Sequence, residues 1–230
     1  MDREQYERIE RYMRKQMRMC DGAHDAEHVL RVLGVGLDIA AHEPDADVDV
    51  VIAACLLHDV GRREQMERGK GCHARIGAKK AEKFLKKSGF GGDFARHVAD
   101  CVRTHRFRSG DAPETIEAKI LYDADKVDVC GATGVARTLF YQGRLGGALY
   151  SLTADGAIAD RDDAGGETFF GEYRYKLERI GERLLTPRGR EIALERRTAA
   201  QAFYESMLAE VRASREEAAA LLERALEGAP

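Results

Sequence analysis

Hydrophobic side chains recur at spacings of three and four residues along most of this chain, and that periodicity is typical of amphipathic helices. The first such stretch is residues 3–20, where Asp2 can cap the N-terminus and Gln5 can complete a capping box. A second helix is expected over about 25–42, and Pro44 ends it. The first 45 residues therefore predict two helices joined by polar segments.

Residues 50–57 form a different kind of stretch, because they carry no charge and lead directly into the pair His58–Asp59. A helix this apolar belongs in a core, and Gly61 ends it. Burying an imidazole and a carboxylate without partners is costly in free energy. A bound metal ion would offset that cost, since neutral imidazole nitrogens and carboxylate oxygens are both ordinary ligands. The pair therefore predicts a buried polar site at the end of the third helix.

The middle of the chain continues the helical pattern. We expect a polar loop over the site at residues 62–72, followed by helices over about 73–88 and 93–106. A further helix begins after Pro113 and reaches Asp125.

Glycine and proline mark the breaks in the C-terminal part of the chain. We expect a break at Gly131 and Gly134 and a loop over residues 153–167. Helices are expected over 135–142, 168–185 and 187–213, followed by a last short helix that begins with a capping box from Ser214 to Glu217.

Composition supports an all-α fold, because only four prolines interrupt 230 residues of which 44% are hydrophobic. We expect a single globular helical bundle over 1–230, with a core at about 20–130 and additional C-terminal helices over about 131–227. The formal net charge of −3 argues against a nucleic-acid partner. No apolar run approaches the roughly 20 residues of a membrane span, and the N-terminus does not resemble a signal peptide. The five scattered cysteines predict free thiols and a cytoplasmic location.

Other histidines and acids lie at helix ends, where packed helices could bring them to His58 and Asp59. These candidates are His28, His73, His105 and Asp125. Each also has a simpler explanation, because a single inward histidine is usually a core residue and His73 could be an N-cap. Spacing alone does not choose among Asp123, Asp125 and Asp128, and His24, His42 and His97 are expected to be solvated.

Together, His28, His58–Asp59 and Asp125 resemble the H…HD…D signature of the HD-domain metal-dependent phosphohydrolase superfamily. Further segments are similar to one branch, the small bacterial HD proteins that resemble nucleotide pyrophosphohydrolases; these are residues 22–32, 123–128, 131–138 and Tyr173-x-x-Lys176-Leu177. The resemblance covers about residues 20–212. It implies a helical HD core and a divalent ion held by the four signature residues.

His73 and His105 lie where HD families with two metals place two additional histidines. The resemblance therefore leaves two arrangements open. Either one ion has two accessory histidines, or two ions are bridged by Asp59, and a set of six ligands favours the second. The residue types do not choose among Mn, Mg, Fe, Co, Ni and Zn.

Phosphoryl chemistry also needs cations to hold the charge that develops on oxygen. We expect Asp59, Arg62 and Lys126 to be catalytic, since Arg62 and Lys126 lie within three residues of proposed ligands. Predicted substrate-binding residues are Arg62, Arg63, Lys126, Arg137 and Lys176, with Lys70 and Arg106 as further local cations and Arg108 as a surface charge. Asp25 or Asp128 could serve as a base or as the acceptor behind a ligand histidine.

The leading hypothesis is a phosphohydrolase that cleaves a nucleotide or a related small phosphorylated molecule, for example a nucleoside triphosphate to its monophosphate and pyrophosphate. Two alternatives stay open, a two-iron oxygenase on the same scaffold and a non-catalytic protein that binds a nucleotide or alarmone. The expected partner is a small phosphorylated substrate, with neither nucleic acid nor membrane. The C-terminal helices suit either a cap on the core or a homodimer interface.

Overall fold

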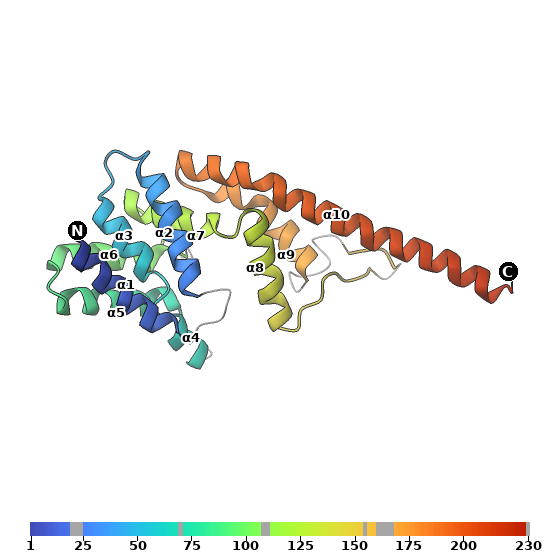
Figure 1. Cartoon of the computed structure of the whole chain (residues 1–230), viewed down its shortest axis with the longest axis horizontal. Helices are drawn as coiled ribbons and strands as arrows, with labels where there is room; N and C mark the ends of the chain where they lie inside the picture. Colours follow the sequence, from blue (N-terminus) through green and yellow to red (C-terminus); the bar gives the residue numbers. More distant parts are fainter. Residues whose placement is uncertain (19–24, 69–70, 107–110, 154–155, 160–167, 229–230) are drawn as a thin grey trace. The chain divides into compact units, whose positions relative to one another are not determined.

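The computed structural model describes residues 1–18, 25–68, 71–106, 111–153, 156–159 and 168–228. In this part of the chain helices predominate, and β-structure is limited to the isolated bridges Ala148–Thr168 and Leu152–Ile158 (Figure 1). The predicted all-α fold is confirmed. Among the helices of these ranges, none combines the length and the apolar character needed to cross a membrane.

The chain divides into two compact units. Unit 1 contains residues 1–129 and 180–193, and unit 2 contains residues 130–179 and 194–230. The single domain expected over 1–230 stays a prediction. The helices of unit 1 are α1 (Arg3–Met17), α2 (Ala26–Ala40), α3 (Val48–Leu57), α4 (Arg62–Arg68), α5 (His73–Lys87), α6 (Gly92–Thr104) and α7 (Ile116–Val127).

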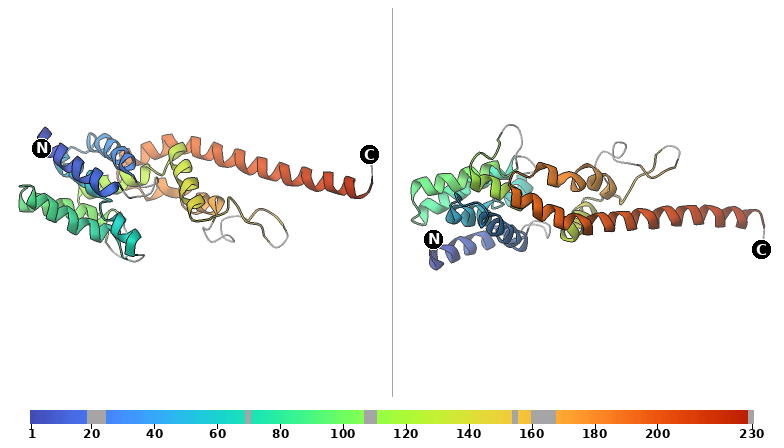
Figure 2. Two further views of the ribbon diagram at one scale, coloured as in Figure 1. Left: turned by 60° about the horizontal axis from the view of Figure 1, so that its bottom comes forward. Right: turned by 90° about the horizontal axis from the view of Figure 1, so that it is seen from above.

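The apolar helix α3 forms the centre of unit 1. It packs against α1, α2, α5, α6 and α7, and α5 and α6 run side by side next to it (Figure 2). From Val50 to Leu57 every residue except Ile52 is buried. Asp47 caps the start of α3 by accepting hydrogen bonds from the amides of Asp49 and Val50. A helix buried on all sides thus delivers the residues that follow it into the interior.

The N-terminal helices begin where the capping residues predict. Asp2 and Gln5 form the expected capping box of α1, and Asp25 caps α2 by accepting from the amide of His28. The predicted loop over 62–72 is wrong in part, because residues 62–68 form α4. Helix α4 has no apolar stripe, and its polar residues are held by local contacts such as the ion pair between Arg63 and Glu67.

Unit 2 contains α8 (Gly131–Arg144), α9 (Phe169–Tyr175) and the 3₁₀ segment η1 (Leu177–Arg183), whose last residues belong to unit 1. The predicted break at Gly134 is wrong, because only Gly131 adopts a positive φ, of 72°, and Gly134 lies buried inside α8. The helix expected over 168–185 divides into α9 and η1. Of the predicted loop 153–167, residues 153 and 156–159 are described, and none is helical.

Helix α10 runs without interruption from Pro187 to Leu226, beginning in unit 1 and continuing in unit 2. The predicted break at Ser214 is therefore wrong. A capping pattern marks a helix start only where the preceding chain leaves the helix, and residues 190–227 contain neither glycine nor proline. Within unit 2, Tyr204 of α10 stacks on Tyr173 with ring centroids 4.2 Å apart.

Candidate metal centre

Two groups of three potential metal ligands lie in the interior of unit 1. The first cluster is His28, His58 and Asp125, and the second cluster is Asp59, His73 and His105. Within each cluster, one nitrogen or oxygen from each residue lies within 4.8 Å of the others. All six residues that the sequence proposes as metal ligands are thus brought into these two groups.

The first cluster joins α2, the end of α3 and α7. His28 Nε2 lies 3.3 Å from His58 Nε2 and 3.5 Å from Asp125 Oδ1. Two ligand atoms at about 2.1 Å from one ion, at a tetrahedral angle, lie about 3.4 Å apart. The spacing in this cluster therefore fits ligands of one shared ion.

The second cluster joins the start of α5, the end of α6 and the turn after α3. His73 Nε2 lies 3.3 Å from His105 Nε2 and 3.3 Å from Asp59 Oδ1. The other oxygen of Asp59, Oδ2, faces the first cluster, 3.6 Å from His58 Nε2 and 3.8 Å from His28 Nε2. The two carboxylate oxygens of Asp59 thus point to different clusters, as a bridging ligand requires.

The second ring nitrogen of every clustered histidine faces a hydrogen-bond acceptor. The contacts run from Nδ1 of His28 to Asp128 Oδ2 (2.8 Å), of His58 to the Cys55 carbonyl (2.8 Å), of His73 to Gln65 Oε1 (2.7 Å) and of His105 to the Val102 carbonyl (2.6 Å). Since an acceptor needs a hydrogen opposite it, each Nδ1 carries the hydrogen and each Nε2 keeps its lone pair. Four lone pairs therefore converge on the carboxylates.

This gathering of acceptor atoms is almost completely buried. His28 and His58 have no exposed surface, and Asp59, His73 and His105 are each 1% exposed. Asp59 Oδ1 has no hydrogen-bond donor among the residues that the structure describes. Buried acceptors that face one another repel unless a cation lies between them. The residues present therefore fit divalent metal ions, whose identity the donor set leaves open.

The pKa values agree with neutral histidines and ionised carboxylates. Burial lowers the pKa of His58, and it lowers that of His73 to about 2 and that of His105 to about 3. Burial alone would raise the pKa of Asp59, but the charge of Arg62 is the first cause that opposes burial, and the pKa lies well below its usual range. Metal ions require these protonation states of their ligands.

Gly61 allows the turn after α3 to lie directly against α5. A Cβ at this position would lie 2.3 Å from the carbonyl oxygen of His73 and 2.5 Å from the amide nitrogen of Gly77. Only glycine permits so close an approach of two backbones. Because His58 caps the end of α3 and Asp59 follows it, the same approach places Asp59 beside His73.

The three acidic residues near the end of α7 have separate positions. Asp125 faces His28, whereas Asp128 accepts hydrogen bonds from His28 Nδ1 and from Arg31. Asp123 points away and accepts from the amides of Leu185 and Thr186. Only Asp125 is thus placed as a ligand, and Asp128 rather than Asp25 lies behind a ligand histidine. Spacing along the chain could not separate the three aspartates, because it does not show which neighbours surround each face of the helix.

Two of the predicted cations contact the carboxylates of the clusters. Arg62 Nε lies 3.0 Å from Asp59 Oδ2, and Lys126 Nζ lies 2.7 Å from Asp125 Oδ2. Their side chains are 23% and 22% exposed, so both reach from the buried centre towards solvent. Arg62 and Lys126 are thus partly exposed cations in contact with the carboxylates of the buried clusters.

The other predicted cations have different surroundings. Arg63 is exposed and forms an ion pair with Glu67. Arg137 lies on α8 of unit 2, and Lys176 of unit 2 pairs with Glu172. Arg106 is close enough to lower the pKa of His73. His24, Lys70 and Arg108 lie outside the described residues.

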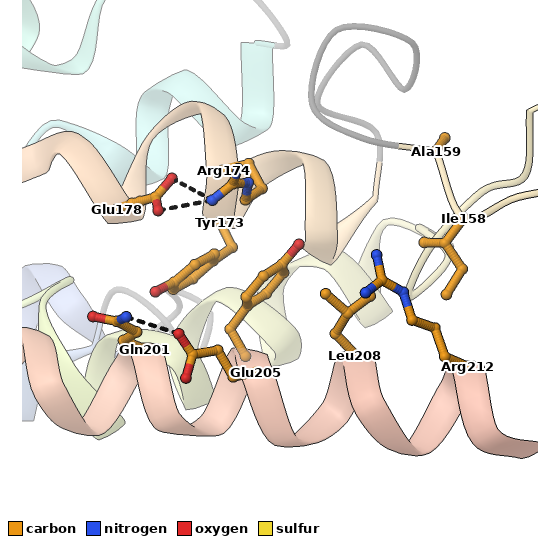
Figure 3. A pocket seen from close by; sticks show the side chains of 10 residues that line it. Ile158, Ala159, Tyr173, Arg174, Glu178, Gln201, Glu205, Leu208 and Arg212 are labelled. Carbon is orange, nitrogen blue, oxygen red and sulfur yellow. Dashed lines mark hydrogen bonds and ion pairs between the residues drawn. The ribbon is translucent and has the colours of Figure 1, made fainter.

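Unit 2 contains a separate pocket of about 280 Å³ between α9, η1 and α10 (Figure 3). Tyr173, Arg174 and Glu178 line it from one side, and Glu205 and Arg212 line it from α10. Glu178 binds the Arg174 guanidinium with both carboxylate oxygens. The lining of this pocket includes none of the clustered ligands and none of the predicted cations, so it is not a part of the candidate metal centre.

The buried histidine and aspartate centre lies in a segment of the chain that matches a known family. Residues 25–130 match the family model of the HD domain, and all six clustered residues lie in this range. The resemblance to HD-domain proteins that the sequence indicates is thus confirmed over this segment. The match supports the general function of a metal-dependent hydrolase, and the histidine and aspartate clusters of this chain could hold the metal.

Known proteins resemble the chain well beyond residue 130. It is 28% identical over 196 residues to YpgQ, an uncharacterized protein of Bacillus subtilis, with 84% of this chain and 86% of YpgQ covered. The structure of YpgQ in complex with ADP aligns with a TM-score of 0.70 at 23% identity, covering 90% of this chain and 95% of that chain.

Two further solved structures share the fold. A predicted HD superfamily hydrolase from an uncultured Thermotogales bacterium is 27% identical, with a TM-score of 0.63 and coverage of 89% of this chain and 91% of that chain. A protein from Lactobacillus plantarum aligns with a TM-score of 0.74 at 21% identity, covering 93% and 99%. At 21% identity the likeness shows the fold alone.

Proposed function

We propose that this protein is a phosphohydrolase that acts on nucleotides and uses two divalent ions bridged by Asp59. The observation that carries the proposal is the position of the Asp59 carboxylate, with one oxygen facing His73 and His105 and the other facing His28 and His58. A divalent ion in either cluster supplies Lewis acidity, which lowers the pKa of water and polarises a phosphoryl oxygen.

The protein residues supply orientation and charge. The acceptors behind each Nδ1 keep the lone pair of every Nε2 directed to the centre, which fixes the ligand geometry. Arg62 and Lys126 partly neutralise Asp59 and Asp125, and as partly exposed cations they can meet the oxygens of a phosphate that enters from solvent. Arg63 is proposed to contact a more distant part of the substrate, and the roles expected of Arg137 and Lys176 in unit 2 stay predictions.

Nucleotides are the favoured substrate class for two reasons. YpgQ, the relative that is 28% identical, has been crystallised with ADP. The segments around Asp123–Asp128 and Gly131–Thr138 also resemble the pyrophosphohydrolase-like branch of the HD superfamily. We therefore propose cleavage of a phosphoanhydride bond, with release of pyrophosphate from a nucleoside triphosphate as the specific reaction.

A substrate panel tests this proposal. Nucleoside mono-, di- and triphosphates, cyclic nucleotides and sugar phosphates are incubated with the protein and Mn, Mg, Co or Ni, and phosphate and pyrophosphate are measured separately. We expect turnover of triphosphates with pyrophosphate as product, and none with the Asp59→Ala variant, which controls for contaminating phosphatases. Absence of turnover across the whole panel would contradict the proposal, whereas release of phosphate alone would correct the reaction.

The complete set of six ligands also favours a second candidate, a two-iron oxygenase. The contacts of Arg62 and Lys126 with the carboxylates lean against it, because an oxygenase has less need of cations beside the centre. Iron content after purification and oxygen consumption with candidate substrates distinguish the two functions.

A further inference from the structure

Gln65 of α4 makes two hydrogen bonds that connect the second cluster to the start of α5. Its Oε1 lies 2.7 Å from His73 Nδ1, and its amide nitrogen donates to the carbonyl oxygen of Gly71 at 2.9 Å. The backbone amide of Gln65 also continues α4 by donating to the Gly61 carbonyl. One side chain of α4 thus joins a proposed metal ligand to the backbone two residues before it.

The Gly71 carbonyl determines which way the Gln65 amide points. A carbonyl oxygen can only accept, so the NH₂ group of Gln65 must face Gly71 and the oxygen must face His73. That oxygen also can only accept, so the hydrogen of His73 must lie on Nδ1. The tautomer of a proposed ligand is therefore determined by a backbone carbonyl through one amide.

Gly71 has a backbone conformation that favours glycine. Its φ is +101°, a region that side chains other than glycine rarely adopt. Its carbonyl accepts from Gln65 immediately before Cys72 and His73 enter α5. Glycine at position 71 and glutamine at position 65 therefore act together.

Asp59 is a second possible acceptor for the hydrogen of His73, so the position of that hydrogen depends on Gln65. Asp59 Oδ1 lies 3.3 Å from His73 Nε2, has no donor of its own among the described residues, and carries the charge of an ionised carboxylate. Without Gln65, the hydrogen of His73 would be drawn to Nε2, where it would occupy the position that a metal ion needs. His58 and His105 are held by backbone carbonyls and His28 by Asp128, so His73 alone relies on a neutral side chain.

We propose that Gln65 is a positioning residue that holds the His73 hydrogen on Nδ1, against the attraction of Asp59, and so keeps Nε2 free for the ion of the second cluster. The effect on metal affinity rests on the two-ion function proposed above. The effect on the tautomer of His73 is independent of that function, because it follows from contacts among the protein's own atoms.

The first experiment measures the tautomer in metal-free protein at neutral pH. Nitrogen-15 spectra of the imidazole rings are assigned with a His73→Ala variant. We expect the hydrogen of His73 on Nδ1 in the wild type and in Gln65→Glu, which keeps an acceptor, and on Nε2 in Gln65→Leu. The signals of His58 and His105 should not change. A wild-type hydrogen on Nε2, or the same His73 tautomer in Gln65→Leu as in the wild type, would overturn the proposal.

The second experiment titrates the chelator-treated protein with Co²⁺ and follows binding by calorimetry and visible absorption. We expect two binding steps, of which only the weaker changes, by about 10- to 100-fold in Gln65→Leu. Glu67→Gln, an exposed change on the same helix, is the matched control and should leave both steps unchanged. An unchanged weaker step in Gln65→Leu overturns the role in affinity. A single step in the wild type refutes the two-ion function and that role together, while the spectra still decide the tautomer.

Discussion

The two clusters of the centre contain the same kinds of side chain but are supported differently. The first is built from α2, α7 and the end of α3, three helices that pack on one another in the core. The second takes His73 and His105 from the ends of α5 and α6 and depends on α4 through Gln65. Behind His28 stands the carboxylate of Asp128, whereas His73 and His105 have neutral acceptors.

This difference teaches that ligand identity alone does not define a metal site. A charged acceptor holds the Nδ1 hydrogen of a ligand imidazole more firmly than a neutral acceptor does, and Arg31, which shares Asp128 at 2.8 Å, weakens this hold. We therefore expect the first cluster to hold its ion more tightly than the second. The following changes test that ranking.

Asp59→Ala should have the largest effect, because it removes the group that faces both clusters. We expect activity to fall by at least about 10³-fold and metal retention to fall in both clusters. Steady-state rates and metal analysis after gel filtration measure the two effects, and circular dichroism checks that helicity is kept. Activity within about tenfold of the wild type would contradict the bridging role of Asp59.

The double variant His73→Ala, His105→Ala should affect one cluster only. We expect about two metal equivalents in the wild type and about one in the variant, with activity about 10²-fold lower. The matched variant His28→Ala, His58→Ala should lose its tighter ion instead. One equivalent in both the wild type and the His73/His105 variant would show that the second cluster does not hold an ion.

Arg62 and Arg63 are neighbours with different surroundings, so their substitution compares a buried contact with an exposed one. Arg62→Ala removes the cation 3.0 Å from Asp59 and should lower kcat/KM by about 10- to 100-fold. Arg63→Ala leaves the centre intact and should lower it by less than about threefold, mainly through KM. Equal decreases in kcat/KM in the two variants would show that Arg63 contributes as much to activity as Arg62.

The last expected effect concerns folding and not activity: the pH dependence of stability in metal-free protein. Burial lowers the pKa of His73 to about 2 and that of His105 to about 3, whereas an unfolded histidine titrates near 6.5. As pH falls below 6.5, the unfolded chain binds protons that the folded protein does not, so stability decreases. Each histidine contributes up to about 1.4 kcal/mol per pH unit.

Urea unfolding in the presence of a chelator at pH 7.5, 6.0 and 5.0 measures this dependence. The His73→Ala, His105→Ala variant should lose stability less steeply over the same range, because it lacks two of the responsible groups. Equal slopes for the two proteins would show that these histidines become protonated within the folded state.

Much of this centre could be predicted from the sequence. The apolar segment before His58–Asp59 indicated a buried helix, and the inward faces of the neighbouring helices indicated His28 and His105. These inferences succeed because core burial leaves a periodic signal in the chain. Spacing left Asp123, Asp125 and Asp128 open, and only the resemblance to the H…HD…D signature indicated Asp125. The assignment of all six as metal ligands stays a prediction.

Other features leave no such signal. Helix α4 has no apolar stripe, and the role of Gln65 depends on the carbonyl of Gly71, six residues later. The contacts of Asp123 and Asp128 depend on which neighbours surround α7, so spacing along one helix could not assign them. Ser214 resembles a helix start, but uninterrupted strong helix formers on both sides keep it inside α10.

The three aspartates at the end of α7, of which Asp128 is the C-cap, have a consequence for how this protein can change. Asp123 holds the backbone at Leu185 and Thr186, Asp125 faces the first cluster and Asp128 holds His28. A single inserted or deleted residue between Asp123 and Asp128 would rotate one attachment against the others by about 100°. We expect this hexapeptide to tolerate substitution at its other positions but not a change in length, so it should be transplanted between related proteins only as a whole.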